Sequence, residues 1–162
     1  MSRTPTHADA ELILKLYDLR REPRMREARR WFMSSFHAST PEEFQALCPP
    51  GSEENASYRM ITTYWNMAAS FVVSGVLHPE LFYQSNQEMM FVWERVRELI
   101  PRSRELYKNP LILKNIEEVA QGYLQWWEKE APEFYPTFSN MVRSLGRQQG
   151  PQPIATEDDE AH

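Results

Sequence analysis

Hydrophobic residues recur at helical spacing along most of the chain, and they are densest between residues 61 and 77. A helix in this stretch would be apolar on most of its sides, as helices buried among other elements are. The run is shorter than the roughly twenty apolar residues that a membrane span needs, and polar residues interrupt it. We therefore expect a central core helix that begins near Ser52 and ends near Gly75.

The same periodicity predicts helices on both sides of this core helix, and several of them open with hydroxyl, proline and acidic residues. They run from about Thr6 to Arg21, Pro23 to Phe36, Pro41 to Leu47, Pro79 to Leu99, Pro110 to Glu130 and Phe138 to Leu145. We expect an all-α fold: a single-domain antiparallel helical bundle of five to seven helices over residues 1–145. Residues 146–162 are polar and end acidic, so we expect a disordered acidic C-terminal tail.

Residues 82–99 have the most regular pattern in the chain. Spacings of three and four alternate through Phe82, Ser85, Met89, Val92, Val96 and Leu99. This pattern predicts one continuous helix that packs along another at a shallow angle. A tight corner at Val76–Glu80, with His78 placed to cap the next helix, would make that helix antiparallel to the core helix. Pro101 would then either kink the helix or restart it.

Composition narrows the class of protein. The chain has 162 residues, of which 41% are hydrophobic and 25% charged, which suits one globular domain. Its net charge of −5 gives no general attraction to nucleic acid or to an anionic membrane. The single cysteine excludes an internal disulfide, and the first residues contain no apolar run long enough for a secretory signal. We expect a cytoplasmic protein without a membrane span.

The sequence shows no constellation typical of catalysis or cofactor binding. The histidines lie at positions 7, 37, 78 and 162, and none follows a glutamate at the Glu-x-x-His spacing of di-metal helical bundles. Cys48 precedes two prolines, and no visible base would activate its thiol. A Gly-rich phosphate loop and a nucleophile elbow are also missing. We expect neither a metal nor another cofactor, and enzymatic activity has little support.

Arginines and aromatic residues supply the candidates for interaction. Residues 1–31 contain eight basic and five acidic side chains, so their net charge is +3 and that of the remaining chain is −8. Such a face could meet phosphate or an acidic partner, or it could be a solvated helix face with internal ion pairs; we do not expect nucleic-acid binding. An aromatic cluster late in the chain could close the core or form a subunit interface; its members are Trp126, Trp127, Phe134, Tyr135 and Phe138. The candidate interaction residues are Arg20, Arg24, Arg26, Arg30, Trp126 and Trp127.

A polar line marks the predicted core helix. Thr62, Asn66 and Ser70 are each four residues apart and therefore share one helix face. Buried polar groups must find partners, which neighbouring helices, water or a small ligand could supply. Structural hydrogen bonding is the simpler interpretation, and a ligand-binding site at these three residues is the alternative.

Scattered residues in the central part of the chain carry a resemblance to a known family. They are Asn66, the run Val73–Leu77, Phe82, Trp93, Ile100, Arg104, Pro110 and the pair Trp126 and Trp127. Over about residues 66–127 the chain resembles an uncharacterised bacterial family of all-helical proteins, a domain of unknown function that often follows a membrane anchor. We see no such anchor in this sequence and expect no membrane role. The resemblance implies an all-helical fold and brings no activity with it.

The leading functional hypothesis is a non-enzymatic protein-interaction or regulatory module that binds a protein partner or self-associates as a homodimer. The surplus of aromatic residues and the lack of a catalytic constellation support it. The alternative hypothesis is a small-ligand-binding helical protein whose site lies on the polar line of the core helix.

Overall fold

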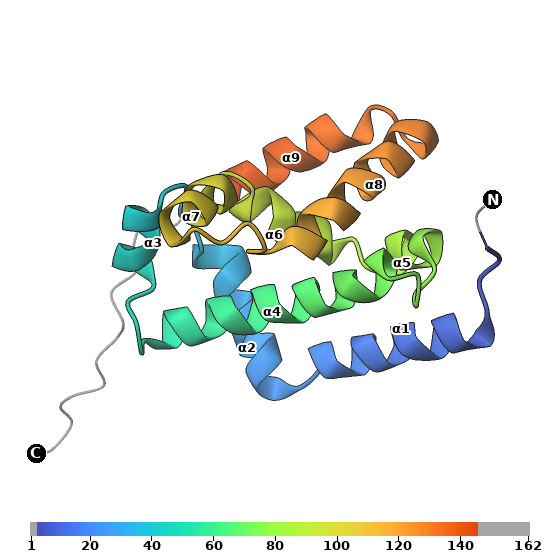
Figure 1. The fold of residues 1–162 in the computed structure, drawn as a ribbon, viewed down its shortest axis with the longest axis horizontal. Coiled ribbons are helices and arrows are strands. Elements are labelled where there is room, and N and C mark those ends of the chain that lie inside the picture. Colours follow the sequence, from blue (N-terminus) through green and yellow to red (C-terminus); the bar gives the residue numbers. More distant parts are fainter. Residues whose placement is uncertain (1–2, 146–162) are drawn as a thin grey trace, which may run out of the picture.

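Nine α-helices and no strand make up the part of the chain that the structure, a computed structural model, describes, which is residues 3–145 (Figure 1). The helices are α1 (His7–Arg20), α2 (Pro23–Ser35), α3 (Pro41–Leu47), α4 (Glu53–Val73), α5 (Pro79–Ser85), α6 (Glu88–Val96), α7 (Leu99–Tyr107), α8 (Lys114–Glu130) and α9 (Phe134–Ser144). The all-α prediction is confirmed, whereas the expected five to seven helices were too few. The predicted acidic tail, residues 146–162, lies outside the described residues.

Several helices begin where the capping residues of the sequence place them. The hydroxyls of Thr6 and Thr40 accept the backbone N–H of the residue three positions later, Asp9 and Glu43. In return, each threonine donates its own backbone N–H to that carboxylate, so amides that lack intrahelical partners are satisfied. The side chain of His78 accepts the backbone N–H of Leu81 at 3.4 Å and so caps α5, as predicted. These local bonds explain why sequence reasoning located the helix starts well.

The long helix expected from Pro79 to Leu99 was wrong, because the chain breaks at Asn86. The Asn86 side chain donates to the carbonyl of Phe82 at 3.3 Å and to the hydroxyl of Ser85 at 3.0 Å. An asparagine that bonds its own backbone offers the chain an alternative to the helix. The regular apolar positions are nevertheless buried, since Phe82, Met89 and Val96 are fully inaccessible, but they belong to α5 and α6 rather than to one helix.

The connection between α7 and α8 also differs from the prediction. Pro101 lies in the first turn of α7 and restarts the helix, while α8 begins at Lys114 rather than near Pro110. Lys108 and Leu113, at the two ends of the connection, adopt left-handed backbone conformations with φ of 52° and 49°. The connection is closed by Arg104, whose guanidinium donates twice to the carbonyl of Ile112 and once to Glu117.

Helix α4 lies at the centre of the core, as expected. It packs mainly against α2 and α8, and its Trp65, Ala68 and Ala69 are fully inaccessible. Figure 1 shows α1 antiparallel to α4, α2 running across it, and α9 antiparallel to α8. The arrangement is therefore more irregular than the antiparallel bundle that was predicted, since only some neighbouring helices run in opposite directions.

The late aromatic cluster closes the core from the side of α9. The ring of Trp127 contacts Phe138 with centroids 5.1 Å apart and Phe134 with centroids 4.9 Å apart. Trp127 is 5% exposed and Phe138 3% exposed. Tyr135 and Ser139 on α9 also donate their hydroxyls to the buried carboxylate of Glu94 on α6. Packing and hydrogen bonds together fix α9 against α6 and α8.

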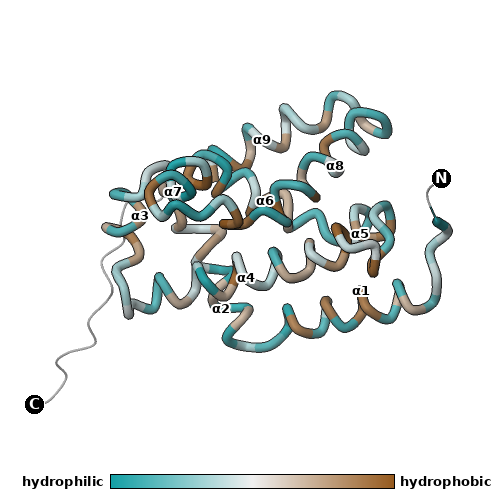
Figure 2. The backbone as a smooth tube through the Cα atoms, viewed as in Figure 1, coloured by the Kyte–Doolittle hydropathy of each residue, from teal (hydrophilic) through white to brown (hydrophobic). Residues whose placement is uncertain are grey.

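Hydrophobic positions occur along α1, α4 and α6 rather than in one continuous stretch (Figure 2). Within residues 3–145, none of the helices combines the length and the apolar character that a membrane crossing requires.

Candidate functional site

The polar line of α4 is hydrogen-bonded within the fold. The hydroxyl of Thr62 donates to the carbonyl of Tyr58 at 2.9 Å, and that of Ser70 donates to the carbonyl of Met67 at 2.6 Å. The Asn66 side-chain oxygen accepts the backbone N–H of Ile116 at 3.4 Å. The cavities described below are lined by other residues, and a ligand site at Thr62, Asn66 and Ser70 stays a prediction.

The contact made by Asn66 has a clear structural role. Ile116 lies in the first turn of α8, whose N-cap residue Leu113 has no side-chain hydrogen bond to offer. The first four N–H groups of a helix lack intrahelical partners, and a side-chain oxygen is their usual substitute. Asn66 therefore caps α8 from a neighbouring helix.

The structure divides the arginine cluster in two. Arg20 and Arg29 point inward and share the carboxylate of Glu88 on α6, with nitrogen–oxygen distances of 3.4 Å and 2.5 Å. The guanidinium of Arg20 also lies over the ring of Trp65, 5.3 Å from its centroid. Arg24, Arg26 and Arg30 are exposed on α2, where Arg24 lies 3.7 Å from Glu53. Of the four arginines predicted to interact, these three are exposed, whereas Arg20 is engaged by Glu88 and Trp65.

The two tryptophans are also engaged within the fold. Trp127 is buried under α9, and Trp126 is half-buried against the rings of Tyr83 and Tyr123, with centroid distances of 5.8 Å and 5.7 Å. Among the described residues, no ring contact, ion pair or hydrogen bond joins either tryptophan to the arginines of α1 and α2. The six predicted interaction residues therefore do not form one contact network.

An apolar groove of about 520 Å³ lies between the α1–α2 corner and α4. Sequence reasoning missed it, because Leu19 belongs to the same hydrophobic stripe as Leu16. The structure buries Leu16 at 1% exposure and leaves Leu19 53% exposed, so the stripe continues past the edge of the core. The groove is lined by Leu19, Glu22, Met25, Met60, Thr63, Tyr64 and Met67.

The polar members of the groove do not change its apolar character. The carboxylate of Glu22 accepts the backbone N–H of Met25 at 2.9 Å and caps α2. Thr63 donates its hydroxyl to the carbonyl of Arg59 on its own helix. Thioether side chains adapt their shape to irregular partners, and methionines occupy both walls of this groove. The surface is suited to an apolar partner.

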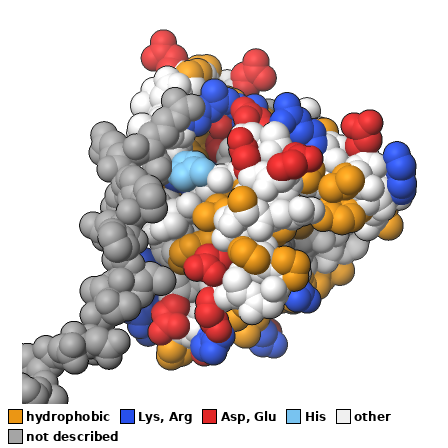
Figure 3. Space-filling view, turned by 90° about the vertical axis from the view of Figure 1, so that its left-hand side faces the viewer, with side chains coloured by type: hydrophobic (Ala, Val, Ile, Leu, Met, Phe, Trp, Pro, Cys, Tyr) orange, Lys and Arg blue, Asp and Glu red, His pale blue; other side chains and the backbone are white. Residues whose placement is uncertain are grey.

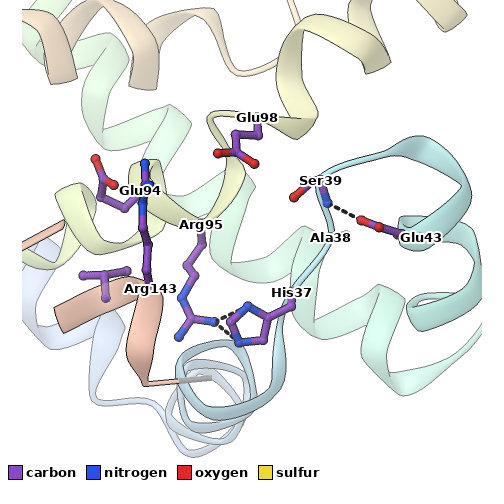
Figure 4. Close-up of a pocket in the computed structure, with 9 residues that line it drawn as sticks. His37, Ala38, Ser39, Glu43, Glu94, Arg95, Glu98 and Arg143 are labelled. Carbon is purple, nitrogen blue, oxygen red and sulfur yellow. Dashed lines mark hydrogen bonds between the residues drawn. The ribbon is translucent and has the colours of Figure 1, made fainter. Parts of the chain in front are cut away.

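A second cavity, of about 470 Å³, has charged walls and lies where the α2–α3 connection, α6 and the C-terminal half of α9 meet. Its lining comprises His37, Ala38, Ser39, Glu43, Glu94, Arg95, Glu98, Val142 and Arg143. Figure 4 shows Arg95 reaching from α6 to the ring of His37, with Arg143 on one side of the cavity and Ser39 and Glu43 on the other. The end of the molecule drawn in Figure 3 intermingles acidic, basic and hydrophobic side chains.

Arg95 differs from the other buried charge of this cavity, Glu94, because it has no ion-pair partner among the described residues. Its side chain donates to the backbone carbonyls of Phe36 and Met33 at 2.5 Å and 3.0 Å and to a ring nitrogen of His37 at 2.8 Å. Its guanidinium also lies over the ring of Phe91, 5.0 Å from the centroid. Burial lowers the pKa of Arg95 to about 10, so the group remains charged at neutral pH.

The described residues offer no arrangement for catalysis by metal or thiol. Between residues 3 and 145, no group of three or more His, Cys, Asp and Glu side chains is placed to hold a metal ion. Burial, with a smaller contribution from Glu54, raises the pKa of the Cys48 thiol to about 11. The thiolate is the nucleophilic form of cysteine, and it is scarce at neutral pH when the pKa is this high.

The fold places the protein in the class of all-α helical domains. The chain belongs to the family described as Domain of unknown function (DUF4760), whose model matches residues 5–126. The predicted resemblance to a family of unknown function is confirmed, and the match extends further toward the N-terminus than the expected residues 66–127. No match was found among curated proteins or among solved structures.

Proposed function

We propose that this protein is a non-enzymatic interaction module that self-associates as a homodimer through the apolar groove between the α1–α2 corner and α4. The observation that carries the proposal is the exposure of Leu19 (53%) and Met67 (39%) on opposite sides of a groove of about 520 Å³. Contiguous exposed apolar surface marks interaction sites more often than isolated apolar residues do.

The geometry of the groove favours a second copy of the chain as the partner. Leu19 lines the groove and is half exposed, so its side chain is available to a partner. In a two-fold symmetric contact, each copy uses the same patch, so a protruding side chain of one copy can fill the hollow of the other. The exposed Arg24 and Arg26 on the following helix would flank this contact and contribute to a polar rim.

The test is the oligomeric state of a variant that places a charge in the groove. Leu19→Lys should convert a dimer into a monomer in native mass spectrometry and light scattering, because burying an ammonium group in an apolar contact is unfavourable. Leu14→Lys is the matched control: it changes a leucine that is 64% exposed on the same helix but outside the groove lining. The two side chains lie about 140° apart around the helix axis, at roughly 100° per residue.

The control is expected to remain dimeric. A wild-type protein that is monomeric at all accessible concentrations would overturn the proposal, as would equal dissociation by both substitutions. Lysine is used at both positions because a positive charge is compatible with the helix dipole in the last turn of α1, where Leu19 lies, and has little effect on it in the middle of the helix, where Leu14 lies.

A further inference from the structure

The charged cavity contains a buried cation without a counter-ion. Arg95 is 7% exposed, and none of the ion pairs among residues 3–145 includes it. Buried charges in proteins are normally paired with an opposite charge, because the loss of hydration otherwise remains uncompensated. The carbonyls at the end of α2 compensate part of this charge through the negative end of the helix dipole.

The hydrogen bonds of Arg95 leave part of its guanidinium unused. A guanidinium carries five N–H donors, and three of them have the acceptors described above. The Nε atom is buried and has no acceptor. An unpaired buried donor is unfavourable, and carboxylate or phosphate oxygens are the acceptors that bind guanidinium groups most strongly.

Two of the three carboxylates around the cavity already have hydrogen-bond partners. Glu94 accepts the hydroxyls of Tyr135 and Ser139 and lies 3.3 Å from Nε of Arg97. Glu43 accepts the backbone N–H groups of Ser39 and Thr40, at 2.7 Å and 3.3 Å, in the capping box of α3. Neither carboxylate therefore neutralises Arg95.

Three charged side chains of the lining, Arg95, Arg143 and Glu98, form no ion pair with a described residue, and Glu43 also keeps its charge because its partners are neutral amides. Arg143 and Glu98 are exposed at the cavity, and no ion pair or hydrogen bond is recorded for either among the described residues. The two arginines and three glutamates of the lining sum to −1, and Arg97, which pairs with Glu94, brings the local sum to zero. Attraction for an anion would therefore come from the two arginines that lack a carboxylate partner, and not from a net positive charge. The cavity volume of about 470 Å³ lies within the range of small-molecule sites.

We propose that this cavity binds a small organic anion, and that its carboxylate or phosphate group is held by Arg95 and Arg143. Arg95 supplies the desolvated charge at the inner wall, and Arg143 supplies a second charge from α9. Glu98 opposes the anion and weakens its binding, unless the ligand also carries an amine. This proposal is independent of self-association, because the cavity and the apolar groove share no lining residue.

The proposal is tested by isothermal titration calorimetry of the full chain with sodium phosphate and, separately, with sodium succinate, at constant ionic strength set by chloride. Saturable binding of one or both anions is expected, and the two titrations distinguish phosphate from carboxylate recognition. Arg143→Gln should weaken binding by roughly tenfold, the factor typical for loss of one charge-assisted hydrogen bond. Glu98→Gln should strengthen it, because the opposing carboxylate is removed.

Two further variants make the result decisive. Arg59→Gln is the matched control, since Arg59 is an exposed arginine of α4 outside the cavity lining and its loss should leave the affinity unchanged. Arg95→Gln should abolish binding, but it also removes the bonds to the end of α2, so its fold must be checked by circular dichroism. The absence of saturable binding of both anions would overturn the proposal. Equal weakening by Arg143→Gln and Arg59→Gln, or weaker binding after Glu98→Gln, would overturn it too.

Discussion

Some single side chains form hydrogen bonds that connect distant parts of the chain, as Asp9 and Asn66 do. The Asp9 carboxylate is 1% exposed and accepts bonds from Arg3, from Thr6 and from the backbone N–H of His78 at the α4–α5 corner. Asn66 connects α4 to the first turn of α8. Both residues satisfy helix ends that would otherwise be buried without partners.

The role of Asn66 predicts a measurable loss of stability. Asn66→Ala should lower the free energy of unfolding by about 1 kcal/mol, the usual effect of removing a helix cap, in urea denaturation followed by circular dichroism. Ser70→Ala is the matched control from the same polar line, because its hydroxyl bonds only its own helix. It should change stability by less than about 0.5 kcal/mol. Identical midpoints for Asn66→Ala and the wild type would contradict the capping role.

The hydrogen bonds of Asp9 predict how the free energy of unfolding depends on pH. The bidentate bonds from Arg3, and further bonds from Thr6 and His78, lower the pKa of Asp9 below its ordinary value of 3.8. In the folded protein, Asp9 therefore stays ionised at an acidic pH at which the same residue in the unfolded chain is already protonated. The resulting stabilisation is complete above about pH 5 and is lost as the pH falls toward the folded-state pKa.

In urea titrations between pH 5 and pH 2.5, Asp9→Asn should lose stability less steeply than the wild type does. Asp18→Asn, which changes an exposed carboxylate of the same helix, should retain the wild-type slope. An Asp9→Asn curve parallel to that of the wild type would show that Asp9 does not carry the acid sensitivity.

At the scale of helices, the contact between α5 and α8 depends on a missing side chain. Gly122 lies in α8, and a Cβ atom added there would overlap the hydroxyl of Tyr83 on α5. The backbone of Tyr83 is held at the same place by the hydroxyl of Tyr123, which donates to its carbonyl. The glycine therefore permits the close approach of the Tyr83 side chain to α8.

This contact changes the effect on stability that is expected when the glycine is replaced by alanine. Replacing a helical glycine by alanine usually stabilises a helix by about 1 kcal/mol, but Gly122→Ala alone should bring no such gain. In the Tyr83→Phe background the overlap is gone, and the same substitution should then stabilise the protein by about 1 kcal/mol. Thermal or urea unfolding of the four proteins in this cycle measures the difference. Equal gains in both backgrounds would contradict the overlap.

Local signals explain how far the helices could be predicted from sequence. Capping residues and prolines placed the starts of α1, α2 and α3, because those signals act within a few residues. The break at Asn86 rests on bonds within four residues, but the regular apolar spacing across it favoured one continuous helix. The late start of α8 could not be predicted, since it depends on contacts between segments. Arg104, for example, holds the carbonyl of Ile112 and the carboxylate of Glu117 from a preceding helix.

At the scale of the whole molecule, the surfaces were harder to predict than the core. The arginines of α1 and α2 cannot be told apart by sequence pattern. In the structure, Arg20 and Arg29 form ion pairs with Glu88, whereas Arg24 is exposed. The charged cavity is built from three segments that lie far apart in the sequence, so no local pattern predicts it. The groove could have been suspected only from the exposed end of a leucine stripe.

Self-association through the groove predicts that stability depends on protein concentration. A dimer that dissociates on unfolding gains stability by mass action, so its melting temperature should rise as the concentration is raised from about 1 to 100 μM. Leu19→Lys should remove this dependence, while Leu14→Lys should keep it. Differential scanning calorimetry of the three proteins measures the effect, and a concentration-independent wild-type melting temperature would contradict a dimer of folded subunits.

Cys48 can report the opening of the structure around it through the reactivity of its thiol. It is the only cysteine of the chain and is 1% exposed at the end of α3. Because a buried thiol reacts with Ellman's reagent only after the structure around it opens, the labelling rate reports how readily this part of the fold opens, and no cysteine has to be introduced. The rate should be slow in the native protein and should increase with urea, so the chain reports the dynamics of its own α3–α4 corner through one coloured reaction.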